Sequence, residues 1–586
     1  MKQFFKFVFA SMVGVIIATL LLFVILIAGV TAVVSSSSET VEIKDNTILH
    51  INLNIPIVER SASTPLDNLD IGPFKGEKSI GLNDILKSIK NAKDDDHIKG
   101  IYLDVSYLMT GFATIEEIRD ALIDFKKSKK FIYAYSEVYT QSAYYLASVA
   151  DNVYLNPQGI LELKGFSSEI TFFKGALDKL GIEAQIIKVG TFKSAVEPFI
   201  LEKMSDANRM QTTSLLGSLY NHFTSAIAKS RNIPQDSIVS IANNLLSRSP
   251  EDAVKLKLID GLKYKDEVLN ELKSKTGIDK KDNLITVGIS DYAKSIKSSS
   301  SAKDKIAIIY ANGEINGGEG DENSIGSEGI SKALRKARLD EKVKAVVLRV
   351  NSPGGSSLAS DVIWREVLLT KKAKPVIVSM GDYAASGGYY ISCAADSIFA
   401  EPNTITGSIG VFAIIPNMKG FLNDKLGVTF DGVKTGQFAD LGNVTRPLTV
   451  PEKMILQKEV NRTYADFTKR VAEGRKISQQ YVDSIGQGRV WTGEQAIKLK
   501  LVDRIGHLED AVKSAARKAK LDDYKLVNYP EIKQGFFGLL DNSGDKIKTY
   551  MVKQELGVSY PYYQKIKEVA NMKGLQARMP FYMEIN

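Results

Sequence analysis

At 586 residues the chain is too long for one hydrophobic core, so we expect two or more domains. The 76 Lys and Arg residues against 68 Asp and Glu give a formal net charge of +8, but the charges are interspersed, which excludes a basic arm for nucleic acid. A single cysteine, Cys393, excludes an intramolecular disulfide framework and a zinc site built from cysteines, and we predict no cofactor or metal.

The N-terminus predicts a membrane anchor. No charged residue occurs from Phe7 to Val34, a run of 28 residues, whereas about 20 residues span a bilayer. The run is longer than the hydrophobic region of a cleaved signal peptide, so we expect residues 1–34 to form a cytoplasmic tip and an uncleaved signal anchor. Lys2 and Lys6 precede the run and net negative charge follows it, which predicts a cytoplasmic N-terminus and an exported remainder.

The rest of the chain is predicted to contain two copies of one α/β unit. Tyr144-Tyr145 and Tyr389-Tyr390 lie 245 residues apart, and the same offset separates the apolar runs at 100–105 and 345–350. In each half, short β-branched strands alternate with longer amphipathic segments, which is typical of a βα-wound domain. We therefore expect a linker at 35–46, repeats at 47–296 and 305–526, a Ser-rich linker at 297–304 and a tail at 527–586.

The second repeat carries two glycine-rich turns that follow predicted strands. The first reads Asn-Ser-Pro-Gly-Gly-Ser at 351–356, and the second contains Ser386 followed by two glycines. A serine in such a strand-to-helix turn exposes its hydroxyl, and the next backbone N–H points into the site. We therefore predict Ser386 as a nucleophile and the N–H groups of Gly355 and Gly387 as oxyanion donors.

A serine hydroxyl needs a base to take its proton, and histidine is scarce in this chain. None of the four histidines lies in the stretch after Ser386 that shapes the site; they are His50, His97, His222 and His507. The remaining candidate is a lysine whose pKa is lowered by burial. Lys193 fits, within the motif Gly-Thr-Phe-Lys-Ser-Ala-Val-Glu-Pro at 190–198.

Four motifs carry a resemblance to a known family: Asn351-Ser-Pro-Gly-Gly, Ala384-Ala-Ser-Gly-Gly-Tyr, Thr406-Gly-Ser-Ile-Gly and the Lys193 motif. Together they resemble the signature of signal peptide peptidase A in its long tandem form, a serine protease family. The resemblance implies Ser386 as nucleophile, Lys193 as general base and Ser408 as a hydroxyl that orients the lysine amine. It also implies a crotonase-like fold shared with the Clp protease subunit, a homotetramer, and peptide substrates such as signal-peptide remnants at the periplasmic face of a bacterial inner membrane.

The two repeats lack complementary parts of this site. Gln141 occupies the position of Ser386, and Tyr107-Leu-Met-Thr110 replaces the glycine turn. Conversely, the position of Lys193 falls on Gln437 or Phe438 in the second repeat, depending on where a gap is placed. We therefore expect one composite site per chain, formed either within the chain or across subunits.

Two other functions stay open at this point. A crotonase-like acyl-CoA enzyme needs neither a serine–lysine pair nor a membrane anchor, and a non-catalytic membrane scaffold has no need of the pair. The tail, with Tyr560, Tyr562 and Tyr563 around a proline, packs on the domain or contacts neighbouring subunits; the sequence does not decide between them.

Overall fold

A computed structural model describes residues 2–36, 42–61, 79–296, 301–321, 323–531, 543–557, 560, 563 and 574–579. The predicted linkers at 35–46 and 297–304 and the predicted tail at 527–586 lie partly outside these described residues, and Tyr562 is among the residues outside them.

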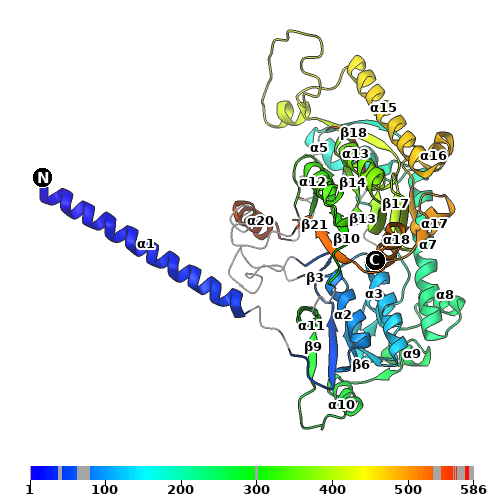
Figure 1. Ribbon diagram of the computed structural model, residues 1–586. Helices are drawn as coiled ribbons and strands as arrows, with labels where there is room; N and C mark the ends of the chain where they lie inside the picture. Colours follow the sequence, from blue (N-terminus) through cyan, green and yellow to red (C-terminus); the bar gives the residue numbers. More distant parts are fainter. Residues whose placement is uncertain are drawn as a thin grey trace.

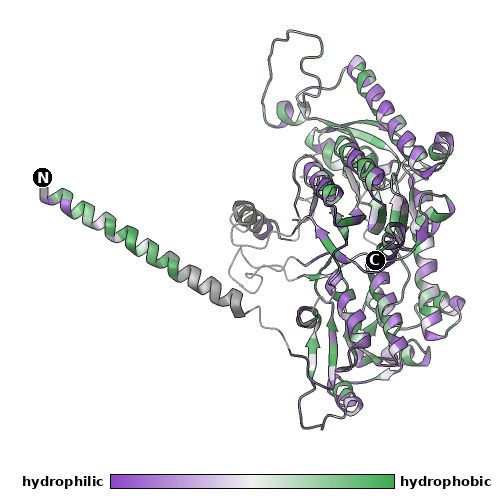
Figure 2. Cartoon of the chain, viewed as in Figure 1, coloured by the Kyte–Doolittle hydropathy of each residue, from purple (hydrophilic) through white to green (hydrophobic). Residues whose placement is uncertain are grey.

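The N-terminal helix α1 (Lys2–Ser36) projects away from the folded body of the protein (Figure 1). Its described side chains are mostly apolar and exposed, and Figure 2 colours most of the described part of this helix as hydrophobic. Among the described residues, Gln3–Leu22 is the one helical stretch whose length and composition suit a membrane span.

The first repeat is built on a parallel six-stranded sheet with the order β8-β6-β5-β4-β1-β9. Its strands are β1 (Thr47–Asn52), β4 (Ile98–Asp104), β5 (Phe131–Tyr139), β6 (Asn152–Leu161), β8 (Gly261–Leu262) and β9 (Thr286–Gly288). A separate short pair joins β2 (Ile57–Val58) to β3 (Ile80–Gly81). The helices are α2 (Leu82–Asp94), α3 (Phe112–Phe125), α4 (Gln141–Ala147), α5 (Lys174–Leu180), α6 (Glu197–Ile200), α7 (Asp206–Arg231), α8 (Gln235–Asn243), α9 (Pro250–Lys255), α10 (Lys265–Thr276) and α11 (Ile289–Ser295).

The second repeat has a sheet with the order β19-β17-β15-β13-β10-β21, in which β16 also pairs with β15 and β20. Its strands are β10 (Lys305–Asn312), β13 (Val343–Ser352), β15 (Val376–Ala385), β16 (Ser397–Ala400), β17 (Ile405–Gly407), β19 (Val490–Thr492), β20 (Arg504–Ile505) and β21 (Lys525–Tyr529). The central strands are buried on both faces because helices cover the sheet, as apolar runs predict. The helices are α12 (Ser327–Leu339), α13 (Ser357–Ala373), α14 (Gly387–Ser392), α15 (Val450–Arg475), α16 (Gln479–Ile485), α17 (Gly493–Lys498) and α18 (Leu508–Ala519); α20 (Ser543–Leu556) follows them.

The two repeats share equivalent hydrogen bonds, which supports the duplication. Tyr144 donates its hydroxyl to the Leu258 carbonyl at 2.7 Å, and Tyr389 donates to the Leu501 carbonyl at 2.8 Å. The long helices α7 and α15 contain 26 residues each and occupy the same place in their repeats. The predicted tandem α/β fold is therefore confirmed.

A third sheet joins the repeats, with the order β12-β11-β14-β22-β18-β7. Its strands are β7 (Glu183–Val189), β11 (Glu314–Asn316), β12 (Ser324–Gly326), β14 (Gly354–Ser356), β18 (Val411–Asn417) and β22 (Gln576–Arg578). β7 belongs to the first repeat and runs antiparallel to β18 of the second, with Val189 opposite Val411. This pairing carries the chain that follows β7, and with it Lys193, to the second repeat.

Buried charges also hold the repeats together. Arg349 on β13 donates to Glu59 at 3.0 Å and to Glu117 on α3 at 2.8 Å. The other oxygen of Glu117 accepts the Leu508 backbone N–H at 2.9 Å, which satisfies a free donor at the start of α18. All these groups are buried, so each charge depends on its partner across the repeat boundary.

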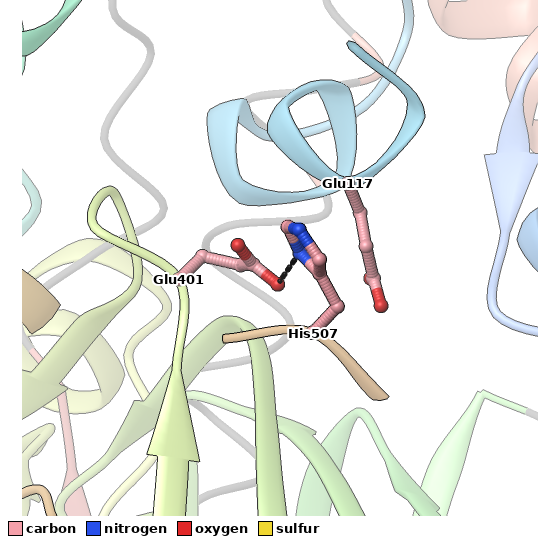
Figure 3. A group of neighbouring side chains, drawn as sticks. All are labelled: Glu117, Glu401 and His507. Atoms are coloured by element: carbon pink, nitrogen blue, oxygen red, sulfur yellow. Dashed lines mark hydrogen bonds and ion pairs between the residues drawn. The ribbon is translucent and has the colours of Figure 1, made fainter. Parts of the chain in front are cut away.

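His507 extends this network beside Glu117 and Glu401 (Figure 3). Its Nδ1 lies 2.9 Å from Glu401 and its Nε2 lies 3.1 Å from Asp120, so both ring nitrogens face carboxylates. Burial opposes the charged ring, but these two carboxylates dominate and raise the pKa of His507 to about 11. We therefore expect a charged ring that pairs with two acids, Asp120 from the first repeat and Glu401 from the second.

Candidate active site

Ser386 lies at the junction of β15 and α14, where the backbone takes an unusual conformation. Its φ of 54° is in the left-handed region, which a non-glycine residue seldom adopts. The Ser386 N–H donates to the Gly407 carbonyl at 2.8 Å, which fixes the turn. Backbone strain of this kind is concentrated at functional sites, and here it directs the Ser386 hydroxyl toward Lys193.

The structure brings together the three predicted polar side chains of the site within one chain. Lys193 Nζ lies 2.9 Å from Ser386 Oγ, 3.1 Å from Ser408 Oγ and 3.1 Å from the Ser408 carbonyl oxygen. Ser408 in turn donates its hydroxyl to the Gly488 carbonyl at 3.4 Å. Ser386 and Lys193 therefore lie in contact within a single chain.

The Lys193 amine is completely buried, with no exposed surface. Burial penalises its charged form and holds its pKa well below the usual value for lysine. The Phe412 ring, centred 6.0 Å from Nζ, packs with Ala195 and Val196 in a small apolar cluster beside the amine. This apolar cluster is part of the buried surroundings that disfavour the charged amine.

The loop that carries Lys193 is held from both repeats. Gln211 on α7 donates to the Phe192 carbonyl at 3.0 Å and to Ser194 Oγ at 2.8 Å. From the second repeat, the Gln487 carbonyl accepts the Phe192 N–H at 2.8 Å. The lysine stem is therefore fixed on each side of its own Cα.

Two glycines give the lysine its space. A Cβ on Gly488 would lie 2.6 Å from the backbone nitrogen of Lys193, and a Cβ on Gly410 would lie 3.1 Å from Cδ of the Lys193 side chain. Gly488 also has a φ of 81°, which favours glycine. Reasoning from sequence assigned no role to Gln211, Phe412, Gly410 and Gly488. Two of them had a signal: Gly410 ends the Thr406-Gly-Ser-Ile-Gly motif, and Gly488 begins a Gly-Arg-Val-Trp-Thr-Gly run.

The two glycine turns of the second repeat contact one another. A Cβ on Gly354 would lie 2.7 Å from the Gly387 nitrogen, so no side chain fits between the turns. Both Gly355 and Gly387 are buried next to Ser386. The positions of these residues are those expected of an oxyanion hole, and donation by their N–H groups stays a prediction.

The corresponding part of the first repeat is filled by protein groups. The Gln141 side chain accepts from the Lys164 and Gly165 N–H groups, both at 3.0 Å, and donates to the Gly165 carbonyl at 3.0 Å. At the position that corresponds to Lys193, Gln437 and Phe438 are exposed. Among the described residues at these equivalent positions, the chain therefore contains one Ser–Lys pair.

Comparison with known proteins agrees with this geometry. Residues 124–279 and 369–522 each match the family described as Peptidase family S49. Protease 4 of Salmonella typhi is 40% identical over 459 residues, which cover 77% of this chain and 74% of that protein. Protease 4 of Haemophilus influenzae is 37% identical, with 84% of this chain and 82% of that protein covered.

Two further likenesses are more distant. The chloroplastic serine protease SPPA of Arabidopsis thaliana is 32% identical, covering 85% of this chain and 74% of that protein. A solved structure of a ClpP1 mutant from Listeria monocytogenes is 18% identical and covers 35% of this chain and 94% of its own, with a TM-score of 0.24. From the family match and the three proteases, the chain belongs to peptidase family S49 as a tandem-repeat serine peptidase.

Proposed function

We propose that this serine peptidase is a membrane-bound endopeptidase that uses a dyad of Ser386 and Lys193. The observation that carries the proposal is the 2.9 Å contact between Ser386 Oγ and the amine of a fully buried lysine. An acyl-CoA enzyme or a scaffold has no use for a lysine whose pKa is lowered in this way, whereas a general base requires it.

The hydrogen-bond geometry suits a neutral amine. A neutral lysine amine has two N–H bonds and one lone pair, and three oxygen atoms surround Lys193 Nζ. The carbonyl of Ser408 can only accept, so it takes one N–H, and the Ser408 hydroxyl oxygen takes the other. The lone pair then faces the Ser386 hydroxyl, which is the arrangement that proton removal needs.

Peptide cleavage follows from these roles. Lys193 takes the proton as Ser386 Oγ attacks the peptide carbonyl, and the N–H groups of Gly355 and Gly387 stabilise the oxyanion. The lysine then gives the proton to the departing amine. Water, activated by the same amine, hydrolyses the acyl–serine ester and restores the enzyme. Ser408 positions the lysine throughout this sequence.

A fluorophosphonate probe tests the nucleophile directly. We expect the wild type and the surface variant Ser484→Ala to be labelled, and Ser386→Ala to be unlabelled and inactive on peptides. If Ser386→Ala keeps a tenth or more of the wild-type turnover, the activation barrier has risen by no more than about 1.4 kcal/mol, and Ser386 is not the nucleophile.

We also propose that α1 anchors the enzyme in the bacterial inner membrane with the repeats on the periplasmic side, where signal-peptide remnants are among its substrates. The support is the apolar helix and the positive charge that precedes it. Protease added to intact spheroplasts should digest the repeats; protection until the membrane is breached would refute this orientation. The homotetramer stays a prediction, to be checked by light scattering in detergent.

A further inference from the structure

We propose that Glu117, Glu401 and His507 bind one Zn²⁺ ion at the boundary between the repeats. One ligand atom of each residue lies within 4.8 Å of the others, and Figure 3 shows the His507 ring between the two carboxylate side chains. Glu117 is on α3 of the first repeat, Glu401 follows β16, and His507 precedes α18. No local motif predicts the site, because its three residues come from distant segments of the chain. The Ser386–Lys193 dyad uses none of them.

The contacts of the His507 ring call for a cation that Nδ1 and Glu401 share. Asp120 lies 3.1 Å from Nε2, and a carboxylate at this distance accepts the N–H of that nitrogen. With Nε2 protonated, the neutral ring has its lone pair on Nδ1, which lies 2.9 Å from Glu401 Oε1. Two acceptors this close repel each other unless a proton or a metal ion binds both. In the metal-free chain a second ring proton does so, and Zn²⁺ replaces that proton.

The Glu401 carboxylate lacks the partners that a buried charge needs. The residue is 1% exposed, and its Oε2 has no hydrogen-bond donor among the described residues. Within the same part of the chain, the His507 ring is its one ion-pair partner. A buried carboxylate oxygen without a donor destabilises the folded state. A doubly charged ion bound by this carboxylate supplies more positive charge than the proton it replaces.

Glu117 can bind a metal ion and keep its present partners. Arg349 donates to its Oε2 at 2.8 Å, and the Leu508 N–H donates to its Oε1 at 2.9 Å. A carboxylate has about four lone-pair sites, so two stay available. Hydrogen bonds of this kind hold metal ligands in place, and a carboxylate is a common partner of the ring nitrogen that faces away from the metal. Asp120 has that position behind His507.

The ligand set and its spacing suit Zn²⁺. Imidazole is a ligand for transition metals, whereas magnesium and calcium prefer oxygen ligands alone. Bonds of about 2.0–2.2 Å at tetrahedral angles place ligand atoms roughly 3.4 Å apart, which lies between the 2.9 Å and the 4.8 Å found here. The His507 side chain is 28% exposed, so water can reach the fourth position.

The bound ion steadies the segment that supports Ser386. The Glu401 N–H donates to Thr404 Oγ1 at 3.0 Å, and that hydroxyl donates to the Gly381 carbonyl on β15 at 2.8 Å. β15 ends one residue before Ser386, and the Gly407 carbonyl at the end of β17 accepts the Ser386 N–H. Because Glu401 begins the stretch that leads into β17, the ion links α3 of the first repeat to this support.

Calorimetric titration of the purified full chain with ZnCl₂, in detergent and after treatment with EDTA, tests the site. We expect one Zn²⁺ per chain in wild type. His97→Gln, a matched control whose more exposed histidine also lies beside two aspartates, should bind equally well. Glu401→Gln and His507→Gln should weaken binding roughly 100-fold or more, because two protein ligands remain. Asp120→Asn changes a partly exposed side chain outside the ligand set and should weaken binding roughly 10- to 100-fold.

Thermal unfolding of the same samples gives a second measurement and shows which variants are folded. The midpoint should rise with ZnCl₂ concentration in wild type and His97→Gln, because an ion that binds only the folded state stabilises it, and should not rise in Glu401→Gln or His507→Gln. Wild type that takes up no Zn²⁺ refutes the site. Wild-type affinity in folded Glu401→Gln or His507→Gln, or loss of binding in His97→Gln, places the ion elsewhere and also refutes it. If neither ligand variant folds, wild-type affinity in Asp120→Asn refutes the site.

Discussion

Replacement of Lys193 by methionine should abolish peptide hydrolysis and at the same time change how stability depends on pH. Methionine fills most of the volume of the lysine stem without a titratable group. In the folded wild type, burial holds the pKa of Lys193 well below its usual value, whereas in the unfolded chain it returns to about 10.4. Between these two pKa values the unfolded chain binds one more proton than the folded chain.

The sign and size of the effect follow from this difference in proton binding. Stability rises with pH wherever the unfolded state binds more protons, by up to ~1.4 kcal/mol per pH unit for a single proton. From pH 7 to pH 9 the wild type should therefore gain up to ~2.7 kcal/mol relative to Lys193→Met. At pH 7 the variant should be the more stable protein because it no longer buries an amine that water would protonate.

Urea unfolding in detergent at pH 7 and pH 9 measures this difference. Lys371→Met is a matched control, since Lys371 is only partly buried and donates to the carbonyls of Ala394 and Ala395 at 2.8 Å and 3.3 Å. The control should keep both its activity and the pH dependence of wild type. An equal pH dependence in wild type and Lys193→Met would show that Lys193 is charged in the folded state, and the reasoning on the base would fail.

The remaining predictions concern the surroundings of the dyad. The wild-type kcat/KM should fall on acidification along one ionisation, since protonation removes the lone pair, and Lys193→Arg should be inactive at every pH because guanidinium stays charged. Ser408→Ala keeps the Ser408 carbonyl contact but loses the hydroxyl, so kcat should fall roughly 10- to 100-fold with little change in KM. Gly488→Ala should reduce hydrolysis because its Cβ would displace Lys193, whereas Gly277→Ala, with a similar φ of 73° but open space around it, should not. Glu117→Gln should lower the free energy of unfolding by about 3–5 kcal/mol in urea, because it leaves Arg349 without one buried partner; Glu473→Gln on the surface is the control.

The sequence was sufficient to predict the duplicated fold because its signals are local. Buried strands such as 345–350 read as continuous apolar runs, and the same runs recur 245 residues apart. The candidate catalytic side chains could also be predicted, since a serine between glycine turns requires a base, no histidine lies in the stretch after Ser386, and Lys193 lies in a distinctive motif. The sequence did not predict how Ser386 and Lys193 come into contact. That contact depends on the pairing of β7 with β18, whose residues lie more than 200 positions apart.

The other residues around the site were harder to predict. Some are glycines that matter because they have no side chain, and others make contacts with residues that are distant in sequence. Gly410 matters for the space that its missing side chain leaves to Lys193, and nothing in its local sequence distinguishes that role from an ordinary turn. β22 contains three residues and pairs with β14, a three-residue strand more than 200 positions away. A strand this short has no hydrophobic periodicity from which it could be predicted. Yet this short strand brings the Ala577 carbonyl oxygen close to both Gly354 and Gly387. The place of β22 in the sheet is set by its pairing with β14 and β18, two strands that are distant in sequence, rather than by a signal of its own.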